Sequence, residues 1–164
     1  MSVGLPPFQQ LVDAYWRDVA RLAAALGGTQ DGEDVAQQAW TQALAAYPSL
    51  AHGRNLRSWL FTITARAAID NHRGRARRAV PFDELPEGAA QATAEPVDEL
   101  LWHRVRCLPE RQRIAVTLHY VLDLPHAEVA AIIGTTPAAA RRLVSDALAI
   151  LRNVPAANPS EEAP

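Results

Sequence analysis

The sequence predicts an all-α protein in which two small helical domains are joined by a flexible acidic linker. Three observations support this fold class. Apolar residues recur at three- and four-residue spacing, the period of an amphipathic helix, and no segment shows the alternation of a strand. Residues 80–96 lose this periodicity and are rich in Pro, Ala, Gly and acids, which is typical of linkers. The length of 164 residues suits two small domains, which we expect at 1–79 and 97–153, with a disordered tail at 154–164.

The first predicted helix runs from Pro7 to about Leu26. Gly27-Gly28 should end it, because glycine is favoured just past a helix C-terminus. Its apolar residues form one stripe, as expected for a helix packed on a core: Phe8, Leu11, Val12, Tyr15, Val19, Leu22 and Leu26.

Two further helices complete the first domain. One should begin near Asp31, since carboxylates fill its first turn, where the helix dipole favours negative charge, and it should stop at Tyr47-Pro48. Asn55 is a candidate N-cap for the next helix, which starts at Leu56 and ends among arginines. On this helix we expect Trp59 to point inward and to be structural, with a platform on which a base stacks as the alternative.

The second domain should contain four helices. The first two are predicted from about Val97 to Leu108-Pro109, and then around Ile114, Leu118 and Leu122 up to the turn Asp123-Leu124-Pro125. A short helix from His126 to Ile133 should close at Gly134. Thr136 is the expected cap of the last helix, with Pro137 at its first position.

A short helix, a glycine, a tight turn and a longer helix form the helix-turn-helix pattern, whose second helix enters the major groove of DNA. The inward positions of that helix are Ala140, Leu143, Val144, Ala147, Leu148 and Leu151. The outward positions include Ala138, Ala139, Arg141, Arg142, Ser145 and Asp146. Arginines there can bind phosphates or guanine. Taken alone, the segment also fits a plain helical hairpin with solvated arginines.

Charge is sorted by segment although the formal net charge is only −2. All 16 basic residues are Arg, and seven of them lie between Arg54 and Arg78 against the single acid Asp70. Six acids and no base lie between Asp83 and Glu99. The net charge by itself argues against a general nucleic-acid coat, but the distribution of charge matters more than the sum, and this sorting by segment requires an explanation.

Composition excludes several classes of protein. The single cysteine, Cys107, rules out intrachain disulfides and a Cys-rich zinc module. His103 lies four residues before it, but two ligands do not make a structural zinc site, and we expect a half-buried thiol. The other histidines, His52, His72, His119 and His126, are scattered, so no enzyme, metal or cofactor is expected. No signal peptide or membrane span is evident, and the expected location is cytoplasmic.

Both halves of the chain resemble extracytoplasmic-function sigma factors, members of the sigma-70 family of bacterial RNA polymerase subunits. LPERQRIAVTLHYVLDLPHAEVAAIIGTTPAAARRLVSDALAILR, from Leu108 to Arg152, resembles region 4, the helix-turn-helix domain that reads the minus-thirty-five promoter element. DGEDVAQQAW, from Asp31 to Trp40, and RSWLFTITARAAIDNHR, from Arg57 to Arg73, resemble region 2. The resemblance covers roughly 140 residues in the family's order, with an acidic linker between the halves.

The resemblance implies a non-enzymatic transcription initiation factor that binds bacterial core RNA polymerase, through its β′ and β subunits, and promoter DNA. An anti-sigma factor is a further candidate partner, and membrane insertion is not expected. The resemblance assigns polymerase binding to Asp31, Asp34, Gln37, Gln38 and Trp40. For any one of these residues, helix capping by the acids and a core position for the tryptophan explain the sequence equally well.

By the same resemblance, the third helix and the loop before it would read and melt the minus-ten element. The residues assigned to that DNA are Arg54, Asn55, Arg57, Arg66, Arg73, Arg75 and Arg77. Those assigned to the minus-thirty-five element are Thr136, Ala139, Arg141, Arg142 and Ser145. The linker would pass through polymerase channels that nucleic acid normally occupies, although an ordinary solvated linker explains its acids as well.

The sequence departs from the family's pattern in two places. Arg66 stands where many members carry Asn, which leaves base preference open. The last helix has Leu143, Asp146 and Ala149 where Arg or Lys is common, so binding to the minus-thirty-five element should be weak. A stand-alone dimeric helix-turn-helix regulator remains the alternative, and it would bind its DNA without polymerase.

Overall fold

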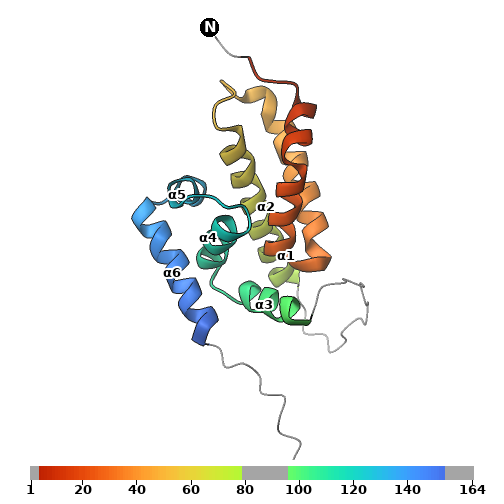
Figure 1. Cartoon of the computed structure of the whole chain (residues 1–164). Coiled ribbons are helices and arrows are strands. Elements are labelled where there is room, and N and C mark those ends of the chain that lie inside the picture. The colour runs from red at the N-terminus through yellow and green to blue at the C-terminus, as the bar shows by residue number, and fades with distance from the viewer. Residues whose placement is uncertain (1–3, 79–95, 154–164) are drawn as a thin grey trace, which may run out of the picture.

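The computed structural model describes residues 4–78 and 96–153, and this part of the chain is helical without strands. Figure 1 shows α1 and α2 side by side as an upright bundle; α3 and α4 contact α1, α5 contacts α2, and α6 packs on the outer side of α4 and α5. The all-α prediction is thus confirmed. The predicted tail and all but the last residue of the predicted linker lie outside the described residues. The elements are α1 (Phe8–Ala46), η1 (Tyr47–Ser49), α2 (Leu56–Arg78), α3 (Pro96–Arg106), α4 (Glu110–Tyr120), α5 (His126–Ile133) and α6 (Pro137–Asn153).

The long element α1 consists of two helical arms that meet at Gly28. Gly28 has φ 77° and ψ −176°, a backbone conformation that residues with a Cβ rarely adopt. The arms then approach closely, since a Cβ on Gly32 would lie 2.8 Å from the Cα of Ala24. The predicted break at Gly27-Gly28 is confirmed, and the acidic second arm is held tightly against the first.

The bundle core comes from the predicted stripe of α1 and one face of α2. Leu11, Val19, Leu22 and Leu26 are buried, and Phe61 of α2 lies edge-on to Tyr15 with ring centroids 6.1 Å apart. Just before α2, Asn55 has φ 58° and its carbonyl accepts the Trp59 N–H at 3.0 Å. In the described residues its side chain makes no capping hydrogen bond. Asn55 therefore occupies the predicted N-cap position directly before Leu56. It acts there through its left-handed backbone, which Asn tolerates well, and not through a side-chain hydrogen bond.

The helix-turn-helix boundaries match their predictions closely. Gly134 ends α5 with φ 76°, and the Ala139 N–H donates to the Thr136 hydroxyl at 3.2 Å, as expected for a capping threonine. One boundary was wrong: α4 ends at Tyr120, before Leu122. Leu122 is nevertheless buried, because the chain turns back at Asp123, whose φ is 55°.

The two halves of the chain share one apolar cluster. α2 contacts α5, and α1 contacts α3 and α4. Buried residues of α2, such as Ala65, therefore belong to the same cluster as Ile114 of α4 and Ile132 of α5. Cys107 lies outside this core. It follows the end of α3 and is exposed, so the prediction of a half-buried thiol was wrong. Its Sγ lies 3.8 Å from Nε2 of His103, the histidine four residues earlier in the sequence.

Candidate functional site

The outward face of α6 is open and carries the predicted minus-thirty-five residues. Thr136, Arg141, Arg142 and Ser145 are exposed, and Ala139 is half-buried. This arrangement follows from the buried stripe of Ala140, Val144 and Ala147, which turns the arginines to solvent.

An acid interrupts that face. The carboxylate of Asp146 points outward, with its Oδ2 3.9 Å from Nε of Arg142, and the two side chains are 51% and 85% exposed. So exposed a pair is weak, because solvent screens it. The negative charge nevertheless lies on the surface that would approach phosphates.

The second arm of α1 presents part of the predicted polymerase-binding set. Asp34 and Gln37 are exposed, whereas Asp31 and Gln38 are half-buried. Trp40 is half-buried, packs on the core and lies edge-on to the Phe8 ring at 6.1 Å between centroids. Trp40 thus combines a packing role with an accessible edge, and the freely accessible polar groups are those of Asp34 and Gln37.

The loop before α2 borders a hollow of about 280 Å³. Two predicted minus-ten residues, Arg54 and Asn55, line it and are exposed. Trp59 forms another wall and also contacts the Tyr47 ring at 6.1 Å between centroids, which fits its expected structural role. Arg57 does not line this hollow; its guanidinium lies 5.8 Å from the centre of the buried Phe61 ring. The hollow has the polar rim and aromatic wall that an unstacked base requires.

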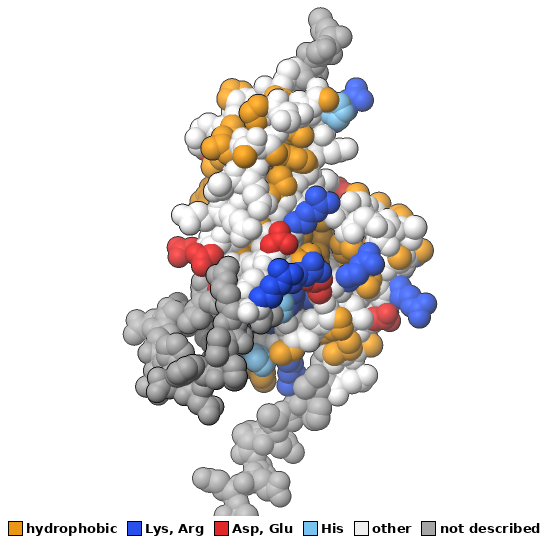
Figure 2. All heavy atoms as spheres, turned by 180° about the vertical axis from the view of Figure 1, so that it is seen from behind, with side chains coloured by type: hydrophobic (Ala, Val, Ile, Leu, Met, Phe, Trp, Pro, Cys, Tyr) orange, Lys and Arg blue, Asp and Glu red, His pale blue; other side chains and the backbone are white. Residues whose placement is uncertain are grey.

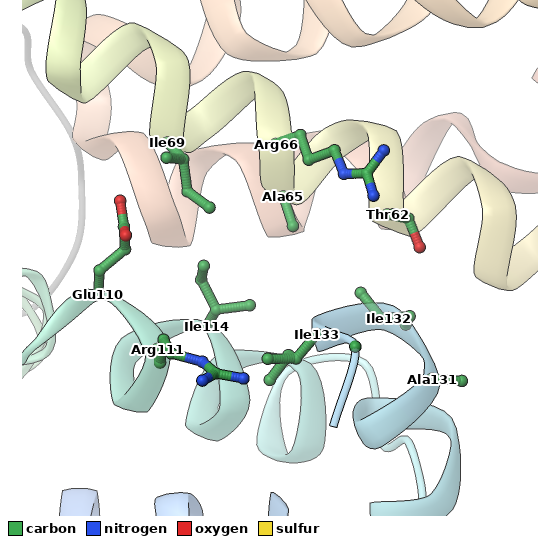
Figure 3. A pocket seen from close by; sticks show the side chains of 11 residues that line it. Thr62, Ala65, Arg66, Ile69, Glu110, Arg111, Ile114, Ala131, Ile132 and Ile133 are labelled. Atoms are coloured by element: carbon green, nitrogen blue, oxygen red, sulfur yellow. The ribbon is translucent and has the colours of Figure 1, made fainter. Parts of the chain in front are cut away.

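The other predicted minus-ten arginines lie farther along α2. Arg66 lines a separate hollow together with Ile132 and Ile133 of α5 (Figure 3). Arg73 Nη2 lies 3.4 Å from Oε2 of Glu110 in α4. Arg77 is exposed, and the side chain of Arg75 is not among those described. The structure therefore separates Arg54 and Asn55 at the loop from Arg66 and Arg73, which face the C-terminal half.

Figure 2 shows arginine side chains gathered from the middle of one face towards the edge formed by the C-terminal helices. One arginine is instead internal. Arg113 is only 6% exposed and donates from Nη1 to the carbonyl of Arg106 at 3.0 Å. Burial lowers the pKa of the Arg113 guanidinium, an effect that the nearby Glu110 and Cys107 oppose. Arg113 therefore has a structural role at the α3–α4 junction.

Sequence reasoning missed one cluster near the helix-turn-helix. The sequence analysis expected scattered histidines, but the rings of His119 and His126 are stacked with their centroids 4.3 Å apart. The Asp123-Leu124-Pro125 turn brings them together, and that turn was the available signal.

In the part of the chain that the structure describes, no group of three or more His, Cys, Asp or Glu side chains could hold a metal ion. No helix there combines the length and apolar character that a membrane span requires.

Comparisons with known proteins find a matching family for each half of the chain. The family described as "Sigma-70 region 2" matches residues 11–78, and "Sigma-70, region 4" matches residues 98–151. The ECF RNA polymerase sigma factor SigD of Mycobacterium tuberculosis is 31% identical over 150 residues, covering 84% of this chain and 68% of SigD. SigJ of the same organism is 32% identical over 149 residues, covering 82% of this chain but 47% of SigJ, so this chain spans about half of that relative.

A solved structure shares the fold. The sigma factor RpoE of Bartonella quintana, in complex with the anti-sigma factor NepR, matches with a TM-score of 0.71 and 25% identity. The match covers 88% of this chain and 94% of the RpoE chain. Because the match covers 88% of this chain, it extends over both halves.

Proposed function

Because the chain belongs to the extracytoplasmic-function sigma factors of the sigma-70 family, we propose that it binds core RNA polymerase and directs it to specific promoters. The activity is one of binding and requires no covalent chemistry. The observation that carries the proposal is the combination, in one chain, of a helix-turn-helix with exposed arginines and an acidic helical arm on which Asp34 and Gln37 are exposed.

Region 2 supplies the polymerase contact and the minus-ten contact in this proposal. Asp34 and Gln37 on the second arm of α1 meet a basic surface of the β′ subunit. The loop at Arg54 and Asn55 binds the minus-ten strand, and its hollow receives an unstacked base. The polar rim and the wall formed by Trp59 support that role.

Region 4 supplies the upstream contact. α6 lies in the major groove at the minus-thirty-five element, where Arg141 and Arg142 bind guanine or phosphate. Two arginines neutralise few phosphates and Asp146 opposes them, so this contact is weak and the polymerase anchorage carries most of the affinity. The β subunit is a further contact in the proposal.

An anti-sigma factor is the proposed regulatory partner, since the structurally similar RpoE was crystallised with one. The proposed location is the cytoplasm, where polymerase and promoters are found. The alternative of a dimeric stand-alone regulator is not favoured, because matches to sigma regions 2 and 4 occur in order in the same chain.

Run-off transcription with purified bacterial core enzyme on fragmented genomic DNA tests the proposal. We expect discrete transcripts that appear only when both the chain and core enzyme are present, and their start sites should share two upstream motifs. Specific DNA binding by the chain alone, with no transcripts, would instead identify a stand-alone regulator.

A further inference from the structure

A small polar hollow of about 130 Å³ lies where the kink of α1 meets α2 and the α3–α4 junction. Four helices, α1 to α4, supply its walls, so it is separate from the hollow beside the loop before α2 and from the outward face of α6. One water molecule needs about 10–15 Å³ of such space, so there is room for several waters or for one small polyatomic ion. The polar side chains that line it are Asp31, Asn71, His72, Arg106 and Arg113.

Arg113 is the most deeply buried of these side chains. It is 6% exposed, and its Nη1 donates to the carbonyl of Arg106 at 3.0 Å. Its Nε is also buried and has no hydrogen-bond partner among the described residues. Leaving a buried donor of a charged group without an acceptor is costly, and native structures normally supply water or an ion to such a donor. The Nε–H of Arg113 therefore indicates a ligand in the hollow.

A second guanidinium reaches the hollow from the end of α3. Arg106 passes close to Gly28, where an added Cβ would lie 3.3 Å from Cδ and 3.5 Å from Nε of this arginine. Gly28 already needs to be glycine for its φ of 77°, and the missing side chain also leaves room for Arg106. The kink of α1 thus accommodates a guanidinium at the hollow that Arg113 lines.

The lining carries more positive than negative charge. The guanidinium groups of Arg106 and Arg113 are opposed there by one carboxylate, that of Asp31. Glu110 also acts on Arg113, but it is already paired with an exposed arginine of α2 at 3.4 Å. Buried charges are normally balanced by a partner, so the hollow favours one further negative charge.

The donors of the hollow suit an oxyanion. A guanidinium presents N–H groups that can bind two oxygens at once, which is why arginine is common at phosphate and carboxylate sites. The amide of Asn71 and the imidazole of His72 offer further donors from α2. The second arm of α1 begins after Gly28, so its N-terminal end, which favours negative charge, is at the same place.

We propose that this hollow binds a small oxyanion of the phosphate class through the guanidinium groups of Arg106 and Arg113. The ion accepts the Nε–H of Arg113 and balances the excess positive charge. It is a free ion and not a phosphate of a nucleic-acid backbone, because the walls of four helices leave room for a small ion only. Binding ties the kink of α1 to α2 and to the α3–α4 junction, so it stabilises the folded chain.

The Nε–H resonance of Arg113 in a ¹H–¹⁵N spectrum reports on the hollow directly, and its loss in Arg113→Lys identifies it. Inorganic phosphate, added at an ionic strength kept constant with chloride, should move this resonance along a saturable curve. The midpoint of thermal unfolding should rise by about 3–6 °C at about ten times the dissociation constant. A short single-stranded DNA should leave the resonance in place.

Three variants test the assignment of the binding residues. Arg106→Gln should weaken phosphate binding by about tenfold or more, because it removes a charge-assisted hydrogen bond. The matched control Arg111→Gln removes an exposed arginine of α4 that does not line the hollow, and it should bind phosphate as wild type does. Asp31→Asn should strengthen binding, since it removes the competing carboxylate. Circular dichroism shows whether each variant keeps its helices.

Three results would overturn the proposal. If phosphate does not move the Arg113 resonance and the unfolding temperature follows ionic strength alone, the hollow holds only water. Equal phosphate affinities of Arg106→Gln and Arg111→Gln would mean that the ion binds elsewhere on the surface. A resonance that moves with DNA and not with phosphate would assign the site to a nucleic-acid surface instead. No polymerase takes part in these measurements, so their failure leaves the proposed function standing.

Discussion

The rings of His119 and His126 stack almost parallel, with centroids 4.3 Å apart and planes 15° apart, at the corner that leads into the helix-turn-helix. The Nδ1 of His119 donates to the carbonyl of Leu124 at 2.7 Å, which fixes that ring. The Nδ1 of His126 is buried without a hydrogen-bond partner in the described structure. Desolvation, and then the nearby His119 and Arg141, lower the pKa of His126, so folding favours the neutral form of this imidazole.

The stacked pair makes the stability of the chain depend on pH. Since the folded pKa of His126 lies below the ordinary value of about 6.5, the unfolded chain binds the proton more readily, and stability falls as pH drops from about 6.5 through the folded pKa. Thermal unfolding followed between about pH 8 and pH 5 should show this decline, and His126→Gln should reduce it. His52→Gln, in an exposed loop, is the matched control. Identical pH profiles for wild type and His126→Gln would contradict the explanation.

Replacing Arg141 and Arg142 with Ala should impair promoter recognition without impairing polymerase binding. Both side chains are exposed on the open face of α6, and removing an arginine that binds a base costs about 1–3 kcal/mol of binding free energy. Run-off transcription from a promoter with the upstream element should fall more than core binding does. Arg152→Ala, an exposed arginine at the end of the same helix, should change both little. Equal reduction of transcription and core binding in the double variant would count against α6 as the reading helix.

Asp146→Asn should strengthen the upstream contact. The carboxylate is 51% exposed on the proposed DNA face and lies 3.9 Å from Arg142 Nε, so it repels phosphate and competes for that arginine. Removing one charge should raise the affinity of the polymerase complex for upstream-element DNA by about three- to tenfold at low salt, and less at high salt. A gel-shift titration at two salt concentrations measures this change. A decrease in affinity would show that Asp146 contacts a base or orients Arg142 instead.

Gly32→Ala should destabilise the chain, because the new Cβ would lie 2.8 Å from the Cα of Ala24, where backbone rather than a flexible side chain must move. We expect a decrease of about 1–3 kcal/mol in the free energy of unfolding, measured by urea titration. Gly4→Ala, where no atom lies within 4 Å of the added Cβ, should be near neutral. If both variants were equally stable, the close approach of the two α1 arms would be wrong.

Local signals in the sequence predicted the helix ends well, because each such residue acts on the backbone at its own position or a few residues away. Gly28 and Gly134 break or end helices by adopting positive φ, and Thr136 caps the next helix through its hydroxyl. The outward face of α6 followed in the same way from its buried stripe.

The sequence did not reveal which surfaces pack against each other across the two halves. The side of α2 formed by Thr62, Ala65, Arg66 and Ile69 combines three residue types that are common on half-exposed surfaces with one isoleucine, so its contact with α4 and α5 could not be predicted. For the same reason the minus-ten arginines were grouped as one set, whereas the structure divides them. The exposure of Cys107 and the stacking of His119 on His126 depend on where two turns direct the chain. Hydrophobic periodicity does not predict the direction of a turn.

Equilibrium binding of the chain to purified core polymerase, followed by fluorescence anisotropy, tests the central claim most directly. We expect saturable binding that weakens about tenfold or more, roughly 1.4 kcal/mol, when Asp34 and Gln37 are both replaced by Ala. Glu33→Ala, an exposed acid on the same turn, should bind as wild type does. Failure of the wild-type chain to bind core polymerase at any concentration tested would contradict the claim.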